Sequence, residues 1–107
     1  MPIKLSTLKC RACEGLEDKL TSTQIKEYLS KISGWKLNKN QIKKSFKFLN
    51  FQSSLDFINQ VGKLAEQEGH HPDIEFGWGY ATITLTTHSL KGLSINDFIL
   101  AAKIDNL

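Results

Sequence analysis

The stretch that decides the fold is residues 53–88, SSLDFINQVGKLAEQEGHHPDIEFGWGYATITLTTH, where a helical pattern gives way to two strand-like runs. From about Ser53 to Glu68, apolar side chains recur three and four residues apart and form one helix face: Leu55, Ile58, Val61 and Ala65. Gly69 suits the C-terminal end of this helix, because glycine readily adopts the left-handed conformation found there. These residues predict an amphipathic helix.

Two strands are predicted after His71-Pro72, at residues 74–76 and 81–87, joined through the turn-prone segment Gly77-Trp78-Gly79. In the second strand apolar residues alternate with threonines: Ala81, Ile83 and Leu85 against Thr82, Thr84 and Thr86. This alternation predicts one apolar and one polar face, as in an antiparallel hairpin that covers a core.

Toward the N-terminus, the sequence predicts another helix and another hairpin. Thr21 and Gln24 form a capping-box pair, and apolar residues follow at helical spacing: Ile25, Tyr28, Leu29 and Ile32. Gly34 is expected to end this helix. From Trp35 to Phe48 the pattern is strand-like on both sides of the turn residues Asn38-Lys39-Asn40, which predicts a hairpin.

A third helix is predicted near the C-terminus, where Ser94 and Asp97 form a second capping pair. Its apolar stripe comprises Ile95, Phe98, Ile99 and Ala102. The order helix, hairpin, helix, hairpin, helix predicts an α+β fold, with three helices packed on one face of a four-stranded antiparallel sheet. Residues 21–107 form this single domain. Residues 1–20 lack periodicity and are expected to be a poorly ordered or surface-draped N-terminal arm.

The composition is that of an ordinary globular chain. The 107 residues are 40% apolar and 23% charged, with a formal net charge of +3. No apolar stretch is long enough to cross a bilayer, and the first residues lack a signal-peptide hydrophobic region, so a cytoplasmic location is expected. A lysine-rich stretch could attract an anion or nucleic acid, although a solvated strand face is the simpler interpretation: Lys36, Lys39, Lys43, Lys44 and Lys47.

Cys10-x-x-Cys13 is the only cysteine pair. A structural zinc site has four ligands, usually from two such pairs or from one pair and histidines. A redox pair is expected at the start of a helix in a thioredoxin-like unit, and no strand signal precedes this one. We therefore expect two reduced thiols, with a shared or structural metal as the alternative.

The candidate functional residues begin with Glu66-x-x-x-His70-His71-Pro72 and continue to His88, so that all three histidines lie within a short stretch. Histidine exchanges protons near neutral pH. If the helix reaches Gly69, Glu66 and His70 lie on one helix face, and the carboxylate can fix the tautomer of the ring. His71 precedes a proline and leaves the helical register. These residues predict acid/base chemistry.

Simpler interpretations exist for each of these residues. His70 could stabilise the helix C-terminus, and His71 and His88 could be solvated residues of a loop and a strand end. Asp97 is most simply a helix cap. A zinc site made of the three histidines is disfavoured, because helical zinc ligands are normally one turn apart and His70 and His71 are adjacent. The sequence also lacks a nucleophile elbow and a phosphate-binding glycine loop.

The pattern Glu66-x-x-x-His70-His71-Pro72, an aromatic residue at Trp78, His88 ten residues later, then Gly92-Leu93-Ser94 and Asp97, closely resembles the pterin-4a-carbinolamine dehydratases. The resemblance covers residues from about 21 to the C-terminus and includes the order of helices and hairpins. Trp78 stands where many members have tyrosine. The arm with Cys10 and Cys13 lies outside the motif.

This resemblance implies that the substrate is a 4a-hydroxytetrahydropterin, which loses water to give a quinonoid dihydropterin. The reaction requires no cofactor and no metal. By resemblance, the catalytic residues are His70, His71, His88 and Glu66, with proton exchange by His70 and His88 and with Glu66 orienting His70. The substrate-binding residues are His71, Trp78 and Asp97.

The resemblance also implies partners. A homodimer or homotetramer is expected, together with a functional link to an aromatic amino-acid hydroxylase, and no membrane partner. Some relatives act as dimerisation partners of transcription factors, so a binding module that retains a pterin pocket is the competing interpretation. The complete histidine set favours the enzyme.

Overall fold

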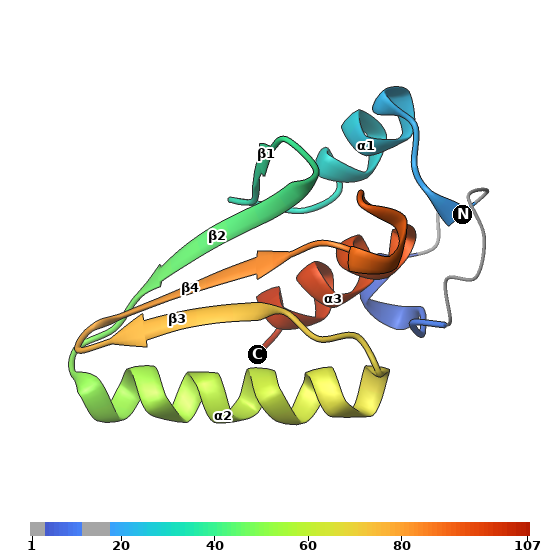
Figure 1. Ribbon diagram of the computed structural model, residues 1–107. Coiled ribbons are helices and arrows are strands. Elements are labelled where there is room, and N and C mark those ends of the chain that lie inside the picture. Colours follow the sequence, from blue (N-terminus) through green and yellow to red (C-terminus); the bar gives the residue numbers. More distant parts are fainter. Residues whose placement is uncertain (1–3, 12–17) are drawn as a thin grey trace.

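The computed structural model describes residues 4–11 and 18–107 (Figure 1). The described elements follow in the order η1 (Leu5–Thr7), α1 (Ser22–Leu29), β1 (Lys36–Asn38), β2 (Gln41–Lys47), α2 (Phe51–Glu68), β3 (Asp73–Gly77), β4 (Tyr80–Leu85), η3 (His88–Leu90) and α3 (Ile95–Asp105). The four strands form one antiparallel sheet in the order β1-β2-β4-β3. The predicted α+β fold of three helices and a four-stranded sheet is confirmed.

The sheet buries one face because the apolar positions of neighbouring strands are paired with one another. Ile42 of β2 pairs with Leu85 of β4, and Ile83 of β4 pairs with Ile74 of β3. The fully buried side chains of this face are Ile42, Ala81, Ile83 and Leu85. They form a core with Phe98 and its neighbours on α3, and the long α2 runs along the sheet beside β3 (Figure 1).

Local signals define most of the helix ends. Thr21 and Gln24 form the predicted capping box of α1. The helix ends at Leu29, five residues before Gly34, because the chain tightens into turns in which the Ser30 hydroxyl donates to the carbonyl of Glu27. α2 begins two residues earlier than predicted, since the Asn50 side chain accepts from the backbone N–H of Ser53.

The sequence predicted a poorly ordered or surface-draped N-terminal arm, and the described part of this arm, residues 4–11, packs against the domain. Leu5 is buried in the hydrophobic core, and Leu8 and Cys10 pack against the same cluster. The 3₁₀-helix η1 contacts α3. Sequence periodicity could not reveal this packing, because a single three-residue helix presents only one buried side chain. Cys13 lies outside the described residues.

The segment after β4 positions the functional residues. β4 ends at Leu85, two residues earlier than predicted, and Thr87 forms an isolated antiparallel bridge with Gly92. His88 therefore begins the short helix η3 instead of ending a strand. No helix in the described part of the chain has the length and apolar character needed to span a membrane.

Candidate active site

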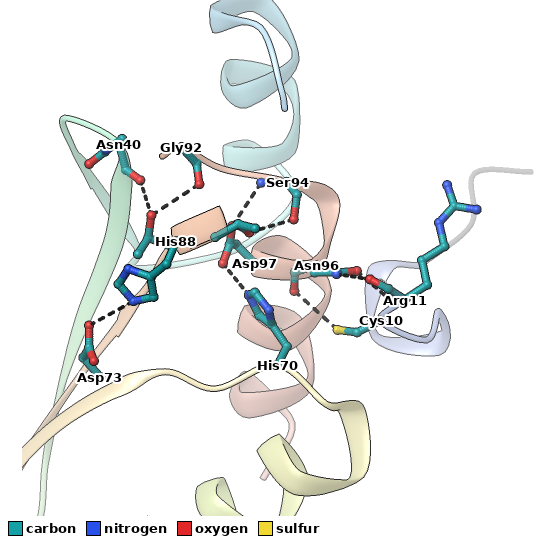
Figure 2. Close-up of polar contacts among 12 residues, drawn as sticks. Cys10, Arg11, Asn40, His70, Asp73, His88, Gly92, Ser94, Asn96 and Asp97 are labelled. Atoms are coloured by element: carbon teal, nitrogen blue, oxygen red, sulfur yellow. Dashed lines mark hydrogen bonds and ion pairs between the residues drawn. The ribbon is translucent and has the colours of Figure 1, made fainter. Parts of the chain in front are cut away.

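The candidate site lies where the C-terminal end of α2, the start of β3 and the segment between β4 and α3 meet (Figures 1 and 2). Gly69 ends α2 in the left-handed conformation, with φ of 65°, and this turns the chain away from the helix axis. His70 and His71 follow, and Pro72 leads into β3. His88 approaches from the other side of the junction.

His70 forms a buried pair with Asp97, the N3 residue of α3. The ring atom Nε2 lies 2.6 Å from Oδ1 of Asp97. The side chain of His70 is 12% exposed and that of Asp97 is fully buried. A carboxylate only accepts hydrogen bonds, so Nε2 carries the proton in this assignment and Nδ1 keeps the lone pair. In this tautomer Nδ1 is the ring atom that can accept a further proton.

The other oxygen of Asp97 is held by two further donors. Oδ2 accepts from the backbone N–H of Ser94 at 3.0 Å and from the hydroxyl of Thr87 at 2.8 Å. The predicted capping pair of Ser94 and Asp97 is therefore confirmed, and the same carboxylate also contacts His70. Asp97 is fully buried, and its carboxylate contacts the ring of His70. Its predicted role as a substrate-binding residue stays a prediction.

Glu66 contacts His71 and not His70. Its Oε2 forms a short hydrogen bond with Nε2 of His71. The side chains of His71 and Glu66 are 62% and 78% exposed. The predicted Glu66–His70 pair is wrong, because Gly69 leaves the helical conformation and removes His70 from the register in which residues four apart face each other.

His88 faces a carboxylate that the sequence did not suggest. Its Nε2 lies 3.9 Å from Oδ2 of Asp73, and both side chains are mostly exposed (Figure 2). Asp73 directly follows Pro72 at the start of β3. An acidic residue beside the His70-His71-Pro72 motif was the signal in the sequence that could have indicated this partner of His88. Each of the three histidines thus faces a different carboxylate.

A polar cavity of about 370 Å³ adjoins His70. A volume of this size lies within the range of small-molecule sites, roughly 300–1,000 Å³. Its walls come from the end of α2, from the segment after β4, from α3 and from the N-terminal arm: Glu68, Gly69, His70, Thr87, Ser89, Asn96, Cys10 and Arg11. Burial, and after it the neighbouring Glu68 carboxylate, raises the pKa of the Cys10 thiol to about 12.

Trp78 lies away from this cluster. Its side chain is 70% exposed in the turn between β3 and β4, at the end of the sheet opposite to the C-terminal end of α2 (Figure 1). The strand β3 separates it from Asp73, and five extended residues span about 14–17 Å. Trp78 therefore lies away from the cavity beside His70 in its own chain, and its predicted substrate contact stays a prediction.

Among residues 4–11 and 18–107, no group of three or more histidine, cysteine, aspartate or glutamate side chains is arranged to hold a metal ion. The donor atoms are instead distributed over three His–carboxylate pairs. A His–Asp pair beside a polar cavity, with two exposed histidines nearby, has the groups that acid/base chemistry on a small polar molecule requires.

Comparison with known proteins assigns the chain to a family. Residues 18–107 match the family model described as "Pterin 4 alpha carbinolamine dehydratase". The chain belongs to this family, as the motif around His70 indicated.

Similar proteins extend the match to the arm. A protein of Azoarcus sp. (strain BH72), provisionally named pterin-4-alpha-carbinolamine dehydratase, is 45% identical over 97% of this chain and 91% of its own length. A solved structure described as a transcriptional coactivator/pterin dehydratase from Brucella melitensis is similar with a TM-score of 0.78 and 31% identity, over 82% of this chain and 96% of that one.

A more distant structural relative is a pterin dehydratase-like protein identified as a RuBisCO assembly factor in the alpha-carboxysome. The TM-score is 0.59 and the identity is 29%, over 68% of this chain and 87% of that one. Members of this structural class thus carry names for dehydratase, coactivator and assembly functions.

Proposed function

We propose that this protein dehydrates a 4a-hydroxytetrahydropterin to the quinonoid dihydropterin by histidine acid/base catalysis. The observation that carries the proposal is the buried His70–Asp97 pair beside a polar cavity, in a chain of the pterin carbinolamine dehydratase family. The reaction breaks the C4a–O bond, removes the proton of N5 and forms the C4a=N5 double bond. Water is the only other product, so the step needs no electron acceptor.

His70 is the proposed base. Its Nδ1 takes the proton of N5, and the Asp97 carboxylate stabilises the imidazolium that results. Asp97 is prepared for this role by Thr87 and Ser94, which hold its second oxygen. A positioned general base typically accelerates a reaction by about 10²–10⁴-fold.

His88 is the proposed acid, which protonates the leaving hydroxide. Its exposed position leaves the ring accessible to a substrate, and the carboxylate of Asp73 lies 3.9 Å from its Nε2. His71 is proposed to hold the pterin and to assist one of the transfers, with Glu66 fixing its ring. The surface position of this pair suits a contact that forms when the substrate binds.

The test is an assay of carbinolamine dehydration on the purified protein. Quinonoid dihydropterin formation is followed by absorbance and compared with the uncatalysed rate and with the His70→Ala variant. We expect a clear acceleration by wild type that His70→Ala loses, with unchanged circular dichroism. No acceleration over the uncatalysed rate would refute the proposed function. Equal turnover by His70→Ala would refute only the assignment of the base.

We further propose that the protein works in the cytoplasm as a homodimer or homotetramer and returns tetrahydropterin to an aromatic amino-acid hydroxylase. Family membership supports these assignments. Sedimentation of the purified protein tests the oligomer. The hydroxylase link is tested by coupled turnover, which should depend on the dehydratase when pterin is limiting.

A second candidate function is binding to a protein partner, such as a transcription factor. It is supported by the coactivator and assembly-factor names of the two structural relatives. Large apolar side chains are also exposed at the far end of the sheet: Leu49, Phe51 and Trp78. A Trp78→Ala variant separates the two candidates, because partner binding would be lost while dehydration of the carbinolamine would remain.

A further inference from the structure

We propose that arm residues Cys10 and Arg11 form a wall of the substrate cavity, and that Asn96 is the positioning residue that holds this wall in place. The proposal rests on the proposed function, because it assigns the cavity beside His70 to the pterin. We call the four residues Cys10, Arg11, Glu68 and Asn96 the arm clamp. The arm precedes the residues matched by the family model, which begin at residue 18.

Asn96 holds the arm through both backbone groups of Arg11. Its Oδ1 accepts from the N–H of Arg11 at 3.1 Å, and its Nδ2 donates to the carbonyl of Arg11 at 2.5 Å (Figure 2). Asn96 is buried, with 4% exposure. A side-chain amide has one donor group and one acceptor on the same plane, so it pairs with a backbone as a neighbouring strand would. Loss of this pairing would leave buried polar groups without partners.

Glu68 holds the preceding residue. Its Oε1 accepts from the backbone N–H of Cys10 at 2.9 Å, and its Oε2 lies 3.7 Å from Nζ of Lys103. The Cys10 thiol lies 3.6 Å from the carbonyl oxygen of Asn96. Five residues earlier, Leu5 anchors the arm in the core. The arm is therefore attached at two separate places along its described length.

The clamp is built next to the proposed catalytic pair. Asn96 directly precedes Asp97 on α3, and Glu68 lies two residues before His70. Cys10 and Arg11 line the same cavity as His70 and Thr87. In Figure 2 the arm lies on one side of His70 and His88 lies on the other. Release of the arm would open the cavity to solvent without breaking the His70–Asp97 hydrogen bond.

This arrangement predicts separate effects on binding and on chemistry. A wall contributes contacts that are present in both the ground state and the transition state, so its loss raises KM and leaves kcat nearly unchanged. Loss of the base, in contrast, lowers kcat. A residue that only stabilised the fold would change neither constant in the folded protein.

The first experiment compares Asn96→Leu, which is similar in size but cannot pair with the arm, with Asn106→Leu at the exposed opposite end of α3. Both variants are made in a Cys13→Ser background, so that Cys10 is the single thiol. We expect Asn96→Leu to raise KM for the carbinolamine by at least about fivefold and to change kcat by less than about twofold. Asn106→Leu should match the Cys13→Ser parent.

A second readout follows the wall directly through alkylation of Cys10 by iodoacetamide. A thiol whose pKa is raised to about 12 by burial reacts slowly at neutral pH. Asn96→Leu should react at least about tenfold faster, because the released arm exposes the thiol. Saturating 7,8-dihydrobiopterin, used as a stable product analogue, should slow alkylation in the parent and leave Asn96→Leu unaffected.

Arg11→Pro and Arg11→Ala provide a matched pair that leaves the core intact. Proline removes the N–H that Asn96 accepts, whereas alanine keeps it. The clamp predicts a KM for Arg11→Pro that is at least about fivefold above that of Arg11→Ala. If Asn96→Leu does not fold, the KM values of Arg11→Pro and Arg11→Ala test the arm clamp in its place.

The outcomes distinguish the clamp from the function on which it rests. A wild-type protein that does not accelerate dehydration overturns the proposed function and the clamp together. An active wild type, with equal KM for Arg11→Pro and Arg11→Ala, overturns the clamp alone. Alkylation of Cys10 that is unaffected by dihydrobiopterin in the folded parent also overturns it.

Discussion

His70 packs inside the protein against the fully buried Asp97, whereas the adjacent His71 lies at the surface beside the exposed Glu66. Both pairs join an imidazole to a carboxylate, and the two histidines are consecutive in the chain. The carboxylate of the His70–Asp97 pair is held by two further donors, the hydroxyl of Thr87 and the backbone N–H of Ser94. The surface pair is formed between two solvated side chains that can move.

This difference in burial indicates a difference in role. A buried carboxylate loses its hydration, so it requires fixed donors, and those donors also hold it in one geometry. A single geometry suits a base that must meet one proton of the substrate. A surface pair is screened by water and contributes little to stability. Its exposure fits the proposed role of His71, which is to contact the pterin when the substrate binds.

Replacement of Asp97 by alanine is expected to have the largest effect, since one carboxylate serves the helix cap and the buried pair. Loss of a cap costs about 1 kcal/mol, and buried donors without an acceptor add roughly 1–3 kcal/mol. The free energy of unfolding should fall by about 2–4 kcal/mol, and dehydration by folded protein should slow by about 10²-fold or more. Urea unfolding and turnover are measured on one preparation.

Asp97→Asn is the matched variant for this prediction, because it keeps the size of the side chain and removes the charge. It should retain more stability than Asp97→Ala and lose a similar part of the rate. Wild-type turnover of the folded Asp97→Asn protein would limit Asp97 to helix capping and remove the proposed difference between the two pairs.

Alanine substitution of His70 and of His71 tests directly whether the buried and the exposed pair have different roles. His70→Ala should lower kcat by about 10²-fold, whereas His71→Ala should lower it by about tenfold or less and mainly raise KM. His88→Ala should lower turnover by at least about tenfold. Circular dichroism verifies that each variant is folded. A larger loss of kcat for His71→Ala than for His70→Ala would reverse the proposed roles.

Glu66→Gln should have a small effect, because the pair it forms with His71 is exposed. Exposed ion pairs contribute about 0–1 kcal/mol, so the urea midpoint should remain close to that of wild type. Turnover should change by less than about fivefold, in contrast to the loss in Asp97→Asn. An equal loss of rate in Glu66→Gln and Asp97→Asn would show that burial does not distinguish the pairs.

The smallest effect is expected at high pH, from the half-buried thiol beside His70. Burial and the Glu68 carboxylate raise the pKa of Cys10 in the folded protein from an ordinary value of 9.0 to about 12. Because the folded state keeps this proton longer, the stability it contributes is complete below about pH 9 and is lost as the pH rises toward 12.

Urea midpoints across that range, for the Cys13→Ser parent and for a variant that also carries Cys10→Ser, measure this contribution. The stability of the parent should decline more steeply with pH than that of the double variant. Parallel declines would show that the thiol titrates alike in the folded and unfolded chains, and that the burial around His70 does not extend to the arm.

Local patterns in the sequence predicted the three α-helices, the two hairpins, the fold class and the family. The alternation of Ala81, Ile83 and Leu85 predicted the buried face of β4, and the pairs Thr21/Gln24 and Ser94/Asp97 marked the starts of α1 and α3. These signals are local, since each depends on residues within one turn of helix or one strand. Such signals can be recognised in the sequence without knowing which elements pack against each other.

The partners of the histidines were decided by the tertiary structure. His70 and Asp97 are 27 residues apart, and they meet only because the end of α2 packs beside the start of α3. Because the chain turns at Gly69 in the left-handed conformation, Glu66 contacts His71, and His70 points toward Asp97. The arm follows the same rule: Arg11 meets Asn96 across 85 positions in the chain. Contacts between residues so far apart in the sequence depend on how whole elements pack, so a pattern within a short stretch of sequence does not predict them.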